Sequence, residues 1–304
     1  MKNNLKVVFF GTPDFAMPVL EALMRNGYNV SHFQKKSLKD ERIFEEFKSL
    51  KPDLCIVAAY GKILPSRYLE VPKYGFLNVH PSLLPKYRGP SPIQTAILNG
   101  DVETGVSLMV VDTEVDHGPI LARTPYKISE SKFNIEVAEE IFKLGAELLI
   151  KILPEYLSGE IKAVEQDHNQ ATFTKMFRRE DGRINWNQPC EKIYNQIRAL
   201  NPEPGTWTTW KGKVINISNV TMFDIVSPTE FLDRLKHGQE TTPSQMTDLA
   251  LGVSGMVKKM SSDIVIRTGT GYLILKSVQL EGGKVMDAKS FVNGHPDFLN
   301  SVLE

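Results

Sequence analysis

The sequence predicts an α/β protein, with a mainly parallel sheet in an N-terminal domain and a smaller domain of short strands after it. In the first part of the chain, short apolar runs such as Leu54–Ala59 alternate with helical patterns such as Ile135–Leu153. Fully apolar strands that alternate with helices are typical of parallel sheets covered on both faces. After about residue 200, short β-like runs with turn signals replace this alternation, which favours a small barrel or sandwich.

The N-terminus has the strand, turn and helix with which nucleotide-type α/β domains begin. We expect a buried strand at 5–10, ended by Gly11-Thr12-Pro13, and a helix capped by Asp14. The helix is expected because apolar residues recur at helical spacing, namely Phe15, Val19, Leu20, Leu23 and Met24. No second glycine follows Gly11 before Gly27, so the dinucleotide fingerprint G-x-G-x-x-G is absent.

Further buried strands are expected at Gly75–His80 and Val106–Val111. The second domain contains four β-like runs, at Lys213–Ile217, Gly255–Met260, Asp263–Thr268 and Tyr272–Leu280. Gly269-Thr270-Gly271 predicts a hairpin between the last two. Helix breakers at 201–205 indicate a connection. We therefore expect domains at 1–188 and 207–304, joined by a linker at 189–206.

Composition excludes several classes of protein. The 304 residues include 36 basic and 36 acidic side chains, so any nucleic-acid surface must be a local patch. The two cysteines, Cys55 and Cys190, and the six scattered histidines indicate neither a disulfide framework nor a metal site. No apolar stretch has the length of a signal-peptide core or a membrane span, and we expect a cytoplasmic protein that does not enter a membrane.

A set of polar residues at two strand ends carries the chemistry. Asn78 and His80 lie two residues apart, so both side chains point to one face of the strand. Asp116 follows the next strand, 38 residues after Asn78 (116 − 78). Each residue alone would more often be a turn or cap residue. Together, beside a loop stiffened by Pro81 and Pro85, they favour an enzyme site for acyl transfer.

The motif Asn78-x-His80-x-Ser82-Leu83-Leu84-Pro85, with Gly89 and Asp116-x-Gly118, resembles the group of 10-formyltetrahydrofolate transferases and hydrolases. The catalytic Asn, His and Asp of that group match Asn78, His80 and Asp116. Blocks along nearly the whole chain resemble the methionyl-tRNA formyltransferase family in particular: 10–16, 59–65, 88–94, 181–186 and 202–207.

This resemblance implies a Rossmann-like catalytic domain and a C-terminal OB-like β-barrel that binds tRNA. It implies 10-formyltetrahydrofolate as formyl donor, initiator methionyl-tRNA as acceptor, and no metal. Asn78 and His80 would stabilise the oxyanion, and Asp116 would favour the charged form of His80. The folate is expected along Ser82, Leu83, Leu84 and Pro85 and the strand end around Val57–Tyr60. A monomer is the default expectation.

Basic residues gather between Lys175 and Lys213, where the sequence contains eight basic and four acidic side chains. Contact with tRNA requires such a patch, although a solvated helix surface would have the same composition. The candidate tRNA contacts are Lys175, Arg178, Arg179, Arg183, Arg198 and Lys211.

The chain departs from the family near residue 30. The family carries a strand, a long basic loop and a helix between the regions of Val30 and Phe33, whereas this chain passes directly from one to the other. Either the chain lacks the segment or the printed sequence omits it. We favour omission, because losing part of the second strand and the helix that follows it should damage the sheet.

Other functions remain open at this point. A formyltransferase for a nucleotide-sugar amine can carry a similar second domain. A glycinamide ribonucleotide formyltransferase would leave the second domain unexplained, and a formyltetrahydrofolate hydrolase would use water as acceptor. A non-catalytic RNA-binding module would have no need of Asn78, His80 and Asp116.

Overall fold

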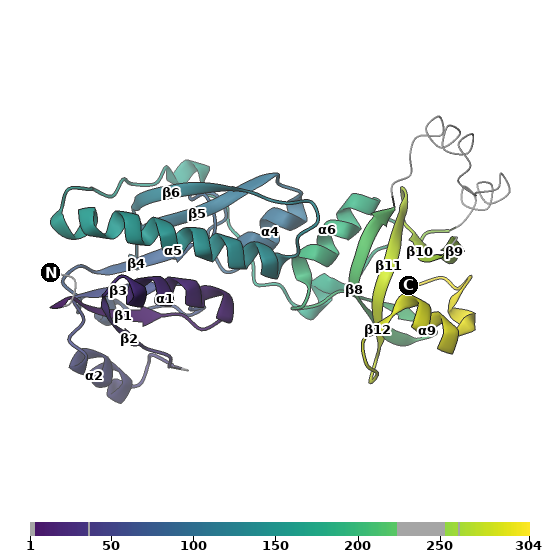
Figure 1. Ribbon diagram of the computed structural model, residues 1–304, viewed down its shortest axis with the longest axis horizontal. Coiled ribbons are helices and arrows are strands. Elements are labelled where there is room, and N and C mark those ends of the chain that lie inside the picture. Colours follow the sequence, from purple (N-terminus) through teal and green to yellow (C-terminus); the bar gives the residue numbers. More distant parts are fainter. Residues whose placement is uncertain (1–3, 36, 224–252, 261) are drawn as a thin grey trace. The chain divides into compact units, whose positions relative to one another are not determined.

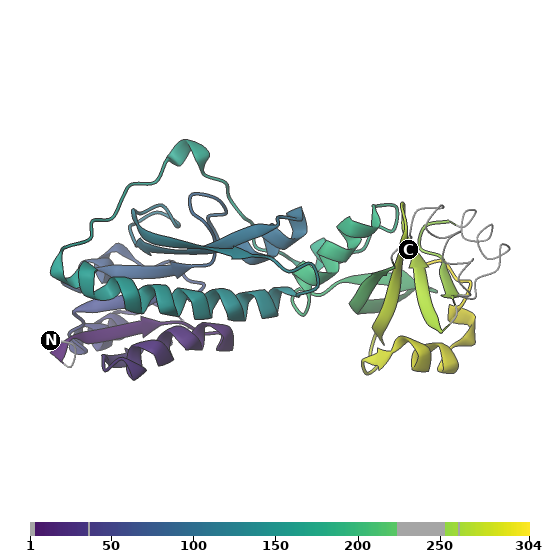
Figure 2. The same cartoon turned by 45° about the horizontal axis from the view of Figure 1, so that its top comes forward.

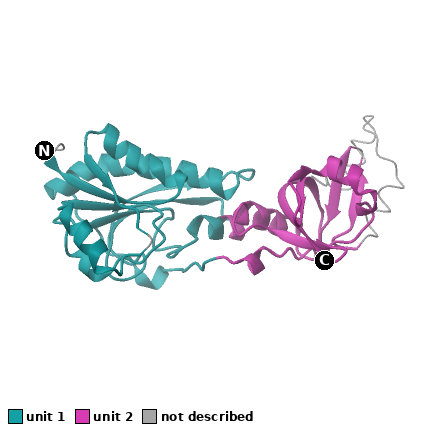
Figure 3. Ribbon diagram, turned by 90° about the horizontal axis from the view of Figure 1, so that it is seen from below, with its two compact units in different colours: residues 1–96, 101–176 teal, residues 97–100, 177–304 magenta. Residues whose placement is uncertain are grey.

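The computed structural model describes residues 4–35, 37–223, 253–260 and 262–304. The chain divides into two compact units, the first made of residues up to 96 and 101–176, the second of 97–100 and 177–304 (Figure 3). Residues 224–252 of the expected C-terminal domain, which include His237, one of the six histidines, lie outside the described residues. Within the described ranges, no helix combines the length and the apolar character needed to cross a bilayer.

The first unit is built on a six-stranded sheet in the order β2-β1-β3-β4-β5-β6 (Figure 1). Its strands are β1 (Lys6–Phe10), β2 (Asn29–His32), β3 (Leu54–Val57), β4 (Phe76–His80), β5 (Glu103–Val110) and β6 (Ile120–Lys127). β2, β1, β3 and β4 pair in parallel, whereas β5 and β6 are antiparallel. The parallel-rich α/β sheet is confirmed. β6 was not predicted, because its apolar run ends after Ile120 and Leu121 and Pro125 lies within it.

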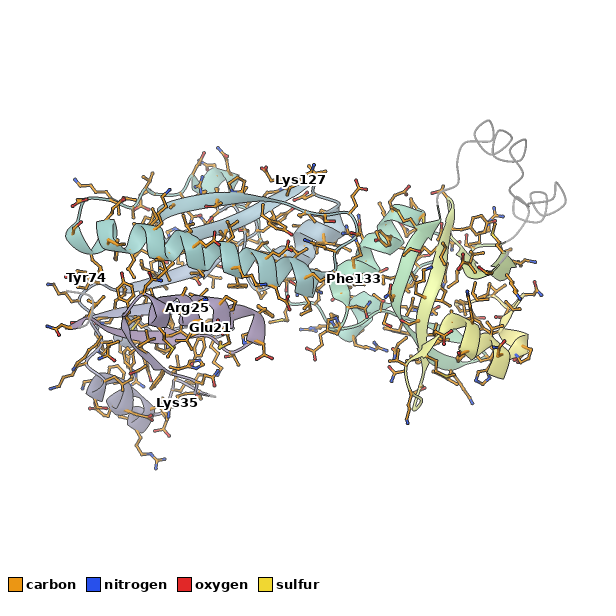
Figure 4. All side chains as sticks on the ribbon, in the orientation of Figure 1. Glu21, Arg25, Lys35, Tyr74, Lys127 and Phe133 are labelled. Atoms are coloured by element: carbon orange, nitrogen blue, oxygen red, sulfur yellow. The ribbon has the colours of Figure 1, made fainter. Side chains whose placement is uncertain are left out.

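Two helices lie side by side on one face of this sheet, α1 (Met17–Arg25) and α5 (Asn134–Ser158) (Figures 1 and 2). Figure 4 shows the exposed pair Glu21 and Arg25 one turn apart on α1. The prediction that Asp14 caps this helix is wrong. Asp14 begins a 3-10 turn and makes no cap, and α1 starts at Met17, because Pro18 lacks an N–H and fits only the first turn of a helix.

The helix α2 (Glu41–Ser49) covers the opposite face, where the core is aromatic. Phe10 is fully buried at its centre, with ring centroids of Phe33, Phe47, Tyr60 and Phe76 between 5.2 and 5.8 Å away. Such tilted and edge-on pairs are favourable beyond the area that they bury. The short elements α3 (Ser66–Leu69) and α4 (Pro92–Asn99) complete the α-helices described up to residue 176, and a 3-10 turn lies at His168–Gln170.

The connection from β2 to α2 is short, and it is well anchored. Phe33 and Leu38 are buried in the aromatic core, and the Asp40 side chain caps α2 by accepting from the Arg42 backbone N–H at 2.9 Å. β2 pairs with β1 along its full length. The edge strand β2 and the helix α2 that covers the sheet are therefore both present in the chain as printed. The expectation that a shorter connection between them should damage the fold does not hold.

The second unit has a curled antiparallel sheet in the order β7-β8-β11-β10-β9 (Figure 2). Its strands are β7 (Trp207–Trp210), β8 (Lys213–Phe223), β9 (Val257–Met260), β10 (Asp263–Arg267) and β11 (Tyr272–Leu280), and β12 (Met286–Asp287) pairs with β11. The predicted hairpin is confirmed, with Arg267 opposite Tyr272. A helix, α9 (Ala288–Gly294), follows β12.

The stretch 189–206, expected to be a linker, contains the helix α6 (Cys190–Leu200). It buries Cys190, Ile193, Ile197 and Leu200 at helical spacing, a pattern that the breakers after it obscured. Both cysteines are free and buried. Burial raises the pKa of the Cys55 thiol well above its usual value and that of Cys190 to about 11, so both stay protonated at neutral pH.

Candidate active site

Three residues from two strand ends meet as the sequence predicts. Asn78 and His80 lie in β4, and Asp116 lies in the loop between β5 and β6. The Asn78 side-chain Nδ2 donates to Asp116 Oδ1 at 3.2 Å, and His80 Nδ1 lies 3.4 Å from the same oxygen. One carboxylate oxygen therefore faces both the amide and the imidazole.

The second oxygen of Asp116 is also occupied. Oδ2 accepts from the backbone N–H of Gly89 at 2.8 Å, and the Asp116 side chain is 14% exposed. Gly89 has φ +106°, and a Cβ there would lie 2.9 Å from Thr174 Oγ1, so only glycine fits this position. The loop after β4 thus fixes the Asp116 carboxylate by its backbone.

His80 is held in one tautomer by its hydrogen-bond partner. Nε2 lies 3.0 Å from the backbone carbonyl oxygen of Tyr87, and the side chain is buried. A carbonyl oxygen only accepts, so Nε2 carries a hydrogen. Nδ1, the nitrogen that faces Asp116, is therefore the nitrogen that can take up and release a proton.

Asn78 keeps donor capacity for a ligand. A side-chain amide has two N–H hydrogens, and Asp116 takes one of them. The residue is half-buried, whereas its neighbours Leu77 and Val79 in β4 are buried. The second hydrogen can therefore bind an oxygen on which negative charge develops.

The four residues of the expected folate loop divide into two pairs. Ser82 is fully buried and its Oγ donates to the Lys86 carbonyl oxygen at 2.6 Å. Leu84 packs in a buried cluster with Met109 and Ile120. Leu83 and Pro85 are half-buried. The side chains of Ser82 and Leu84 thus shape the loop from inside, and those of Leu83 and Pro85 are open to contact.

The candidate tRNA contacts also differ from one another. Five are exposed: Lys175, Arg178, Arg179, Arg183 and Lys211. Arg198 is buried, with its guanidinium donating to Asn195 Oδ1 at 2.8 Å and lying over the Tyr194 ring. Arg198 thus has a structural role in α6, and it is not part of an accessible basic surface.

In the second unit, two of the exposed arginines share one aromatic partner. The guanidinium carbons of Arg179 and Arg183 lie 5.5 and 5.6 Å from the ring centroid of Trp207. Trp207 also donates through Nε1 to the Arg179 carbonyl oxygen at 2.8 Å. An indole beside guanidinium groups is an arrangement that suits stacking and phosphate contact with RNA.

Two residues of the site gave no sequence signal. Tyr87 acts through its backbone carbonyl, which no side-chain pattern reveals. Gln166 contacts the Asp116 loop from the segment after α5, which has no helical or strand period. Among the described residues, no three His, Cys, Asp or Glu side chains are grouped to hold a metal ion.

Replacing Gly118 with alanine is expected to lower the free energy of unfolding by about 1–3 kcal/mol, the usual cost of overpacking. A Cβ at Gly118 would lie 2.1 Å from the Val110 carbonyl oxygen, so the loop that carries Asp116 must shift. Urea unfolding of the variant measures the change. Gly294→Ala is the control and should keep the native stability, because a Cβ at Gly294 would have nothing within 4 Å and its φ lies outside the left-handed region. A Gly118→Ala variant as stable as the native protein would contradict the close approach.

The chain matches two family models and is similar to named relatives. The family model "Formyl transferase" matches residues 12–153, and "Formyl transferase, C-terminal domain" matches 176–296. The chain is 37% identical to a methionyl-tRNA formyltransferase of Roseiflexus castenholzii over 284 residues, 93% of this chain and 83% of the relative. It is 31% identical to that of Fusobacterium nucleatum over 320 residues, 95% of this chain and 97% of the relative.

The alignment with the Fusobacterium protein is longer than this chain, 320 positions against 304 residues. The relative therefore contains residues that have no counterpart here. Among solved structures, HypX from Aquifex aeolicus in complex with tetrahydrofolic acid has a similar fold, with a TM-score of 0.72 and 16% identity. The match covers 99% of this chain and 48% of that one.

Proposed function

The chain belongs to the methionyl-tRNA formyltransferase family, and we propose that Asn78, His80 and Asp116 carry out its reaction. The reaction transfers the formyl group of 10-formyltetrahydrofolate to the α-amino group of methionyl initiator tRNA, which supports translation initiation. The observation that carries the residue assignment is the position of the Asp116 carboxylate, which meets both the Asn78 amide and His80 Nδ1.

Asn78 acts on the formyl oxygen. When the amine attacks the formyl carbon, negative charge develops on that oxygen, and a fixed donor there lowers the barrier. The Asn78 amide is held in place by its hydrogen bond to Asp116, so its second N–H needs no reorientation during the reaction.

His80 and Asp116 handle the proton that the attacking amine must lose. His80 Nδ1 takes up this proton, directly or through a water, because Nε2 already carries a hydrogen toward Tyr87. The Asp116 carboxylate, 3.4 Å from Nδ1, stabilises the positive ring that results. We thus propose His80 as the general base, in place of the oxyanion donor that the resemblance implies, and Asp116 as the group that stabilises the charge that His80 gains.

The folate lies against the half-buried side chains of Leu83 and Pro85 and, at the strand end 57–60, against Ala59, which is half-buried whereas Val57, Ala58 and Tyr60 are buried. Val57 pairs with Asn78 in the register of β3 and β4, so the residues after Val57 continue beside the catalytic strand. Ser82 and Leu84 support the folate by fixing the loop. A fixed apolar surface with a few polar groups nearby suits an aromatic ligand.

We assign the second unit an OB-like fold and the binding of tRNA. In support of this, its antiparallel sheet is curled, and the ring centroid of Trp207 lies 5.5 and 5.6 Å from the guanidinium carbons of the exposed Arg179 and Arg183. We also propose that the protein is cytoplasmic, since its buried free thiols suit a reducing compartment, and we keep the monomer as the default expectation. Sedimentation at micromolar concentration tests the monomer.

The variant Arg178→Ala/Arg183→Ala is expected to bind tRNA more weakly and with a lower salt dependence. Each lost phosphate contact reduces the slope of log K against log salt by roughly 1, so the double variant should lose about 2. Fluorescence titration at several salt concentrations measures the slope. Arg25→Ala, in an exposed ion pair on α1 (Figure 4), is the control and should keep the native slope. An unchanged slope in the double variant would exclude these arginines.

The experiment that tests the function is formyl transfer from 10-formyltetrahydrofolate to charged initiator methionyl-tRNA. A nucleotide-sugar amine, glycinamide ribonucleotide and water alone are assayed beside it. Transfer to the tRNA that is lost in Asp116→Ala supports both the function and the site. Turnover on another acceptor only would keep the catalytic residues and reject tRNA as substrate.

A further inference from the structure

A buried arginine lies next to the active site without touching the three reacting side chains. Arg88 is 3% exposed, and its guanidinium donates to neutral acceptors. Nε and Nη2 lie 3.1 and 2.7 Å from Gln166 Oε1, and Nη2 lies 2.9 Å from His168 Nδ1. Burying a charge is costly unless its hydrogen bonds are satisfied, so the arrangement calls for an explanation other than packing.

Gln166 connects this arginine to the Asp116 loop. Its side chain is 4% exposed, and its Nε2 donates to the backbone carbonyl oxygens of Asp116 at 3.0 Å and Gly118 at 2.7 Å. Both hydrogens of the amide are thus used on one loop. The loop is held on both sides of His117, at the two residues that define the Asp116-x-Gly118 motif.

Arg88 determines which way the Gln166 amide points. A guanidinium has donors only, so the oxygen of the amide must face it. The nitrogen is then directed to the loop. If the amide were reversed, Nε2 would face the guanidinium and Oε1 would face two carbonyl oxygens, which leaves buried groups unpaired.

The loop needs this support because Asp116 has an unusual backbone. Its φ is +48°, in the left-handed region that residues other than glycine rarely adopt. Such a conformation persists only where the surroundings hold it. The carboxylate is held by the Gly89 N–H, and the backbone carbonyl by Gln166.

We propose that Arg88 and Gln166 are positioning residues, which hold the Asp116 carboxylate against Asn78 and His80 without contacting either substrate. The proposal rests on the catalytic role of Asp116 argued above. A small displacement of a catalytic group can lower turnover by up to about 100-fold. Binding of the two substrates should be unaffected, since neither residue lies on the proposed folate or tRNA surface.

The test is Gln166→Met, which keeps the length of the side chain and removes its hydrogen bonds. We expect kcat to fall by about 10-fold to 100-fold, with the KM of folate and of tRNA within about twofold of the native values. The matched control is Gln170→Met, because Gln170 is exposed on the same segment and bonds only to Asp167. A native kcat in Gln166→Met would overturn the proposal.

A second variant separates positioning from folding. Gln166→Glu keeps an acceptor for Arg88 and gives the buried guanidinium a carboxylate partner, but its other oxygen cannot donate to Asp116 and Gly118. We expect a melting temperature below that of the native protein, because two buried carbonyl oxygens lose their donor, but above that of Gln166→Met, because the guanidinium keeps a partner, with kcat still lowered by about 10-fold. Native turnover in Gln166→Glu would show that the donated hydrogen bonds are dispensable, and would reject the proposal.

A double-mutant cycle distinguishes this proposal from the catalytic assignment. If Gln166 acts through Asp116, Gln166→Met should add less than a twofold loss to Asp116→Asn. Losses that multiply would give Gln166 an independent structural effect and overturn the positioning role. If Asp116→Asn alone is fully active, the catalytic assignment fails instead.

Discussion

Asp116→Asn is expected to lower kcat by about 10³-fold, within the range of ~10²–10⁴ that general acid–base catalysis contributes. The carboxylate accepts on both oxygens, from Asn78 at 3.2 Å and from the Gly89 N–H at 2.8 Å. An amide has one acceptor oxygen and cannot replace both. It also brings no negative charge to His80 Nδ1 at 3.4 Å. The fold should survive, because asparagine tolerates the left-handed φ of +48° at this position.

The measurement is single-turnover formyl transfer at saturating folate and tRNA, with thermal unfolding recorded for the same sample. Glu114→Gln is the matched control: it removes a carboxylate from the same loop, where the Glu114 side chain is 72% exposed. The control should keep native turnover. If the rate constant of Asp116→Asn falls by less than about tenfold, the loss is smaller than general acid–base catalysis contributes. Asp116 would then have no part in the mechanism.

Asn78→Ala is expected to reduce kcat by about 10²–10³-fold, the usual cost of losing one oxyanion donor. The residue pairs with Val57 and Met109 through the sheet backbone, so its side chain is not needed for the strand. The loss should therefore appear in kcat, while the KM of the folate changes little. Asn26→Ala, which removes an asparagine at the end of α1, should leave turnover unchanged.

The same samples decide between catalysis and structure for Asn78. If Asn78→Ala unfolds at a much lower temperature, the residue has a structural role and the loss of activity carries no information on the oxyanion. A folded variant with native kcat would contradict the assignment directly. A higher folate concentration is not expected to restore the turnover of Asn78→Ala, because the lost interaction forms only as charge develops on the formyl oxygen.

Much of the sheet and the catalytic residues could be predicted from local pattern. Mainly apolar runs located β1, β3 and β4, and period two placed Asn78 and His80 on one face. β6 escaped because it borders solvent on one side, and α6 because helix breakers follow it closely. The two misses have different causes, since the apolar run of β6 ends after Leu121 and the end of α6 is masked by the breakers at 201–205.

The finer parts of the site depend on contacts that no local pattern specifies. Arg198 reads as a surface charge in a basic stretch, yet α6 turns it inward over Tyr194. Ser82 faces the interior because its hydroxyl satisfies the Lys86 carbonyl. Gln166 reaches the Asp116 loop across 50 residues of sequence. Side-chain direction in loops follows from tertiary hydrogen bonds, which a sequence alone does not reveal.

The hydrogen bond between His80 Nε2 and the Tyr87 carbonyl oxygen constrains the route of the proton. An imidazole can pass a proton across the ring only if one nitrogen gains it while the other releases its own. Here the Nε2 hydrogen faces a carbonyl that cannot carry it away. A proton taken up at Nδ1 must therefore leave from Nδ1, so it enters and exits on the side of Asp116. Each turnover has to release that proton from Nδ1 before the next amine can react.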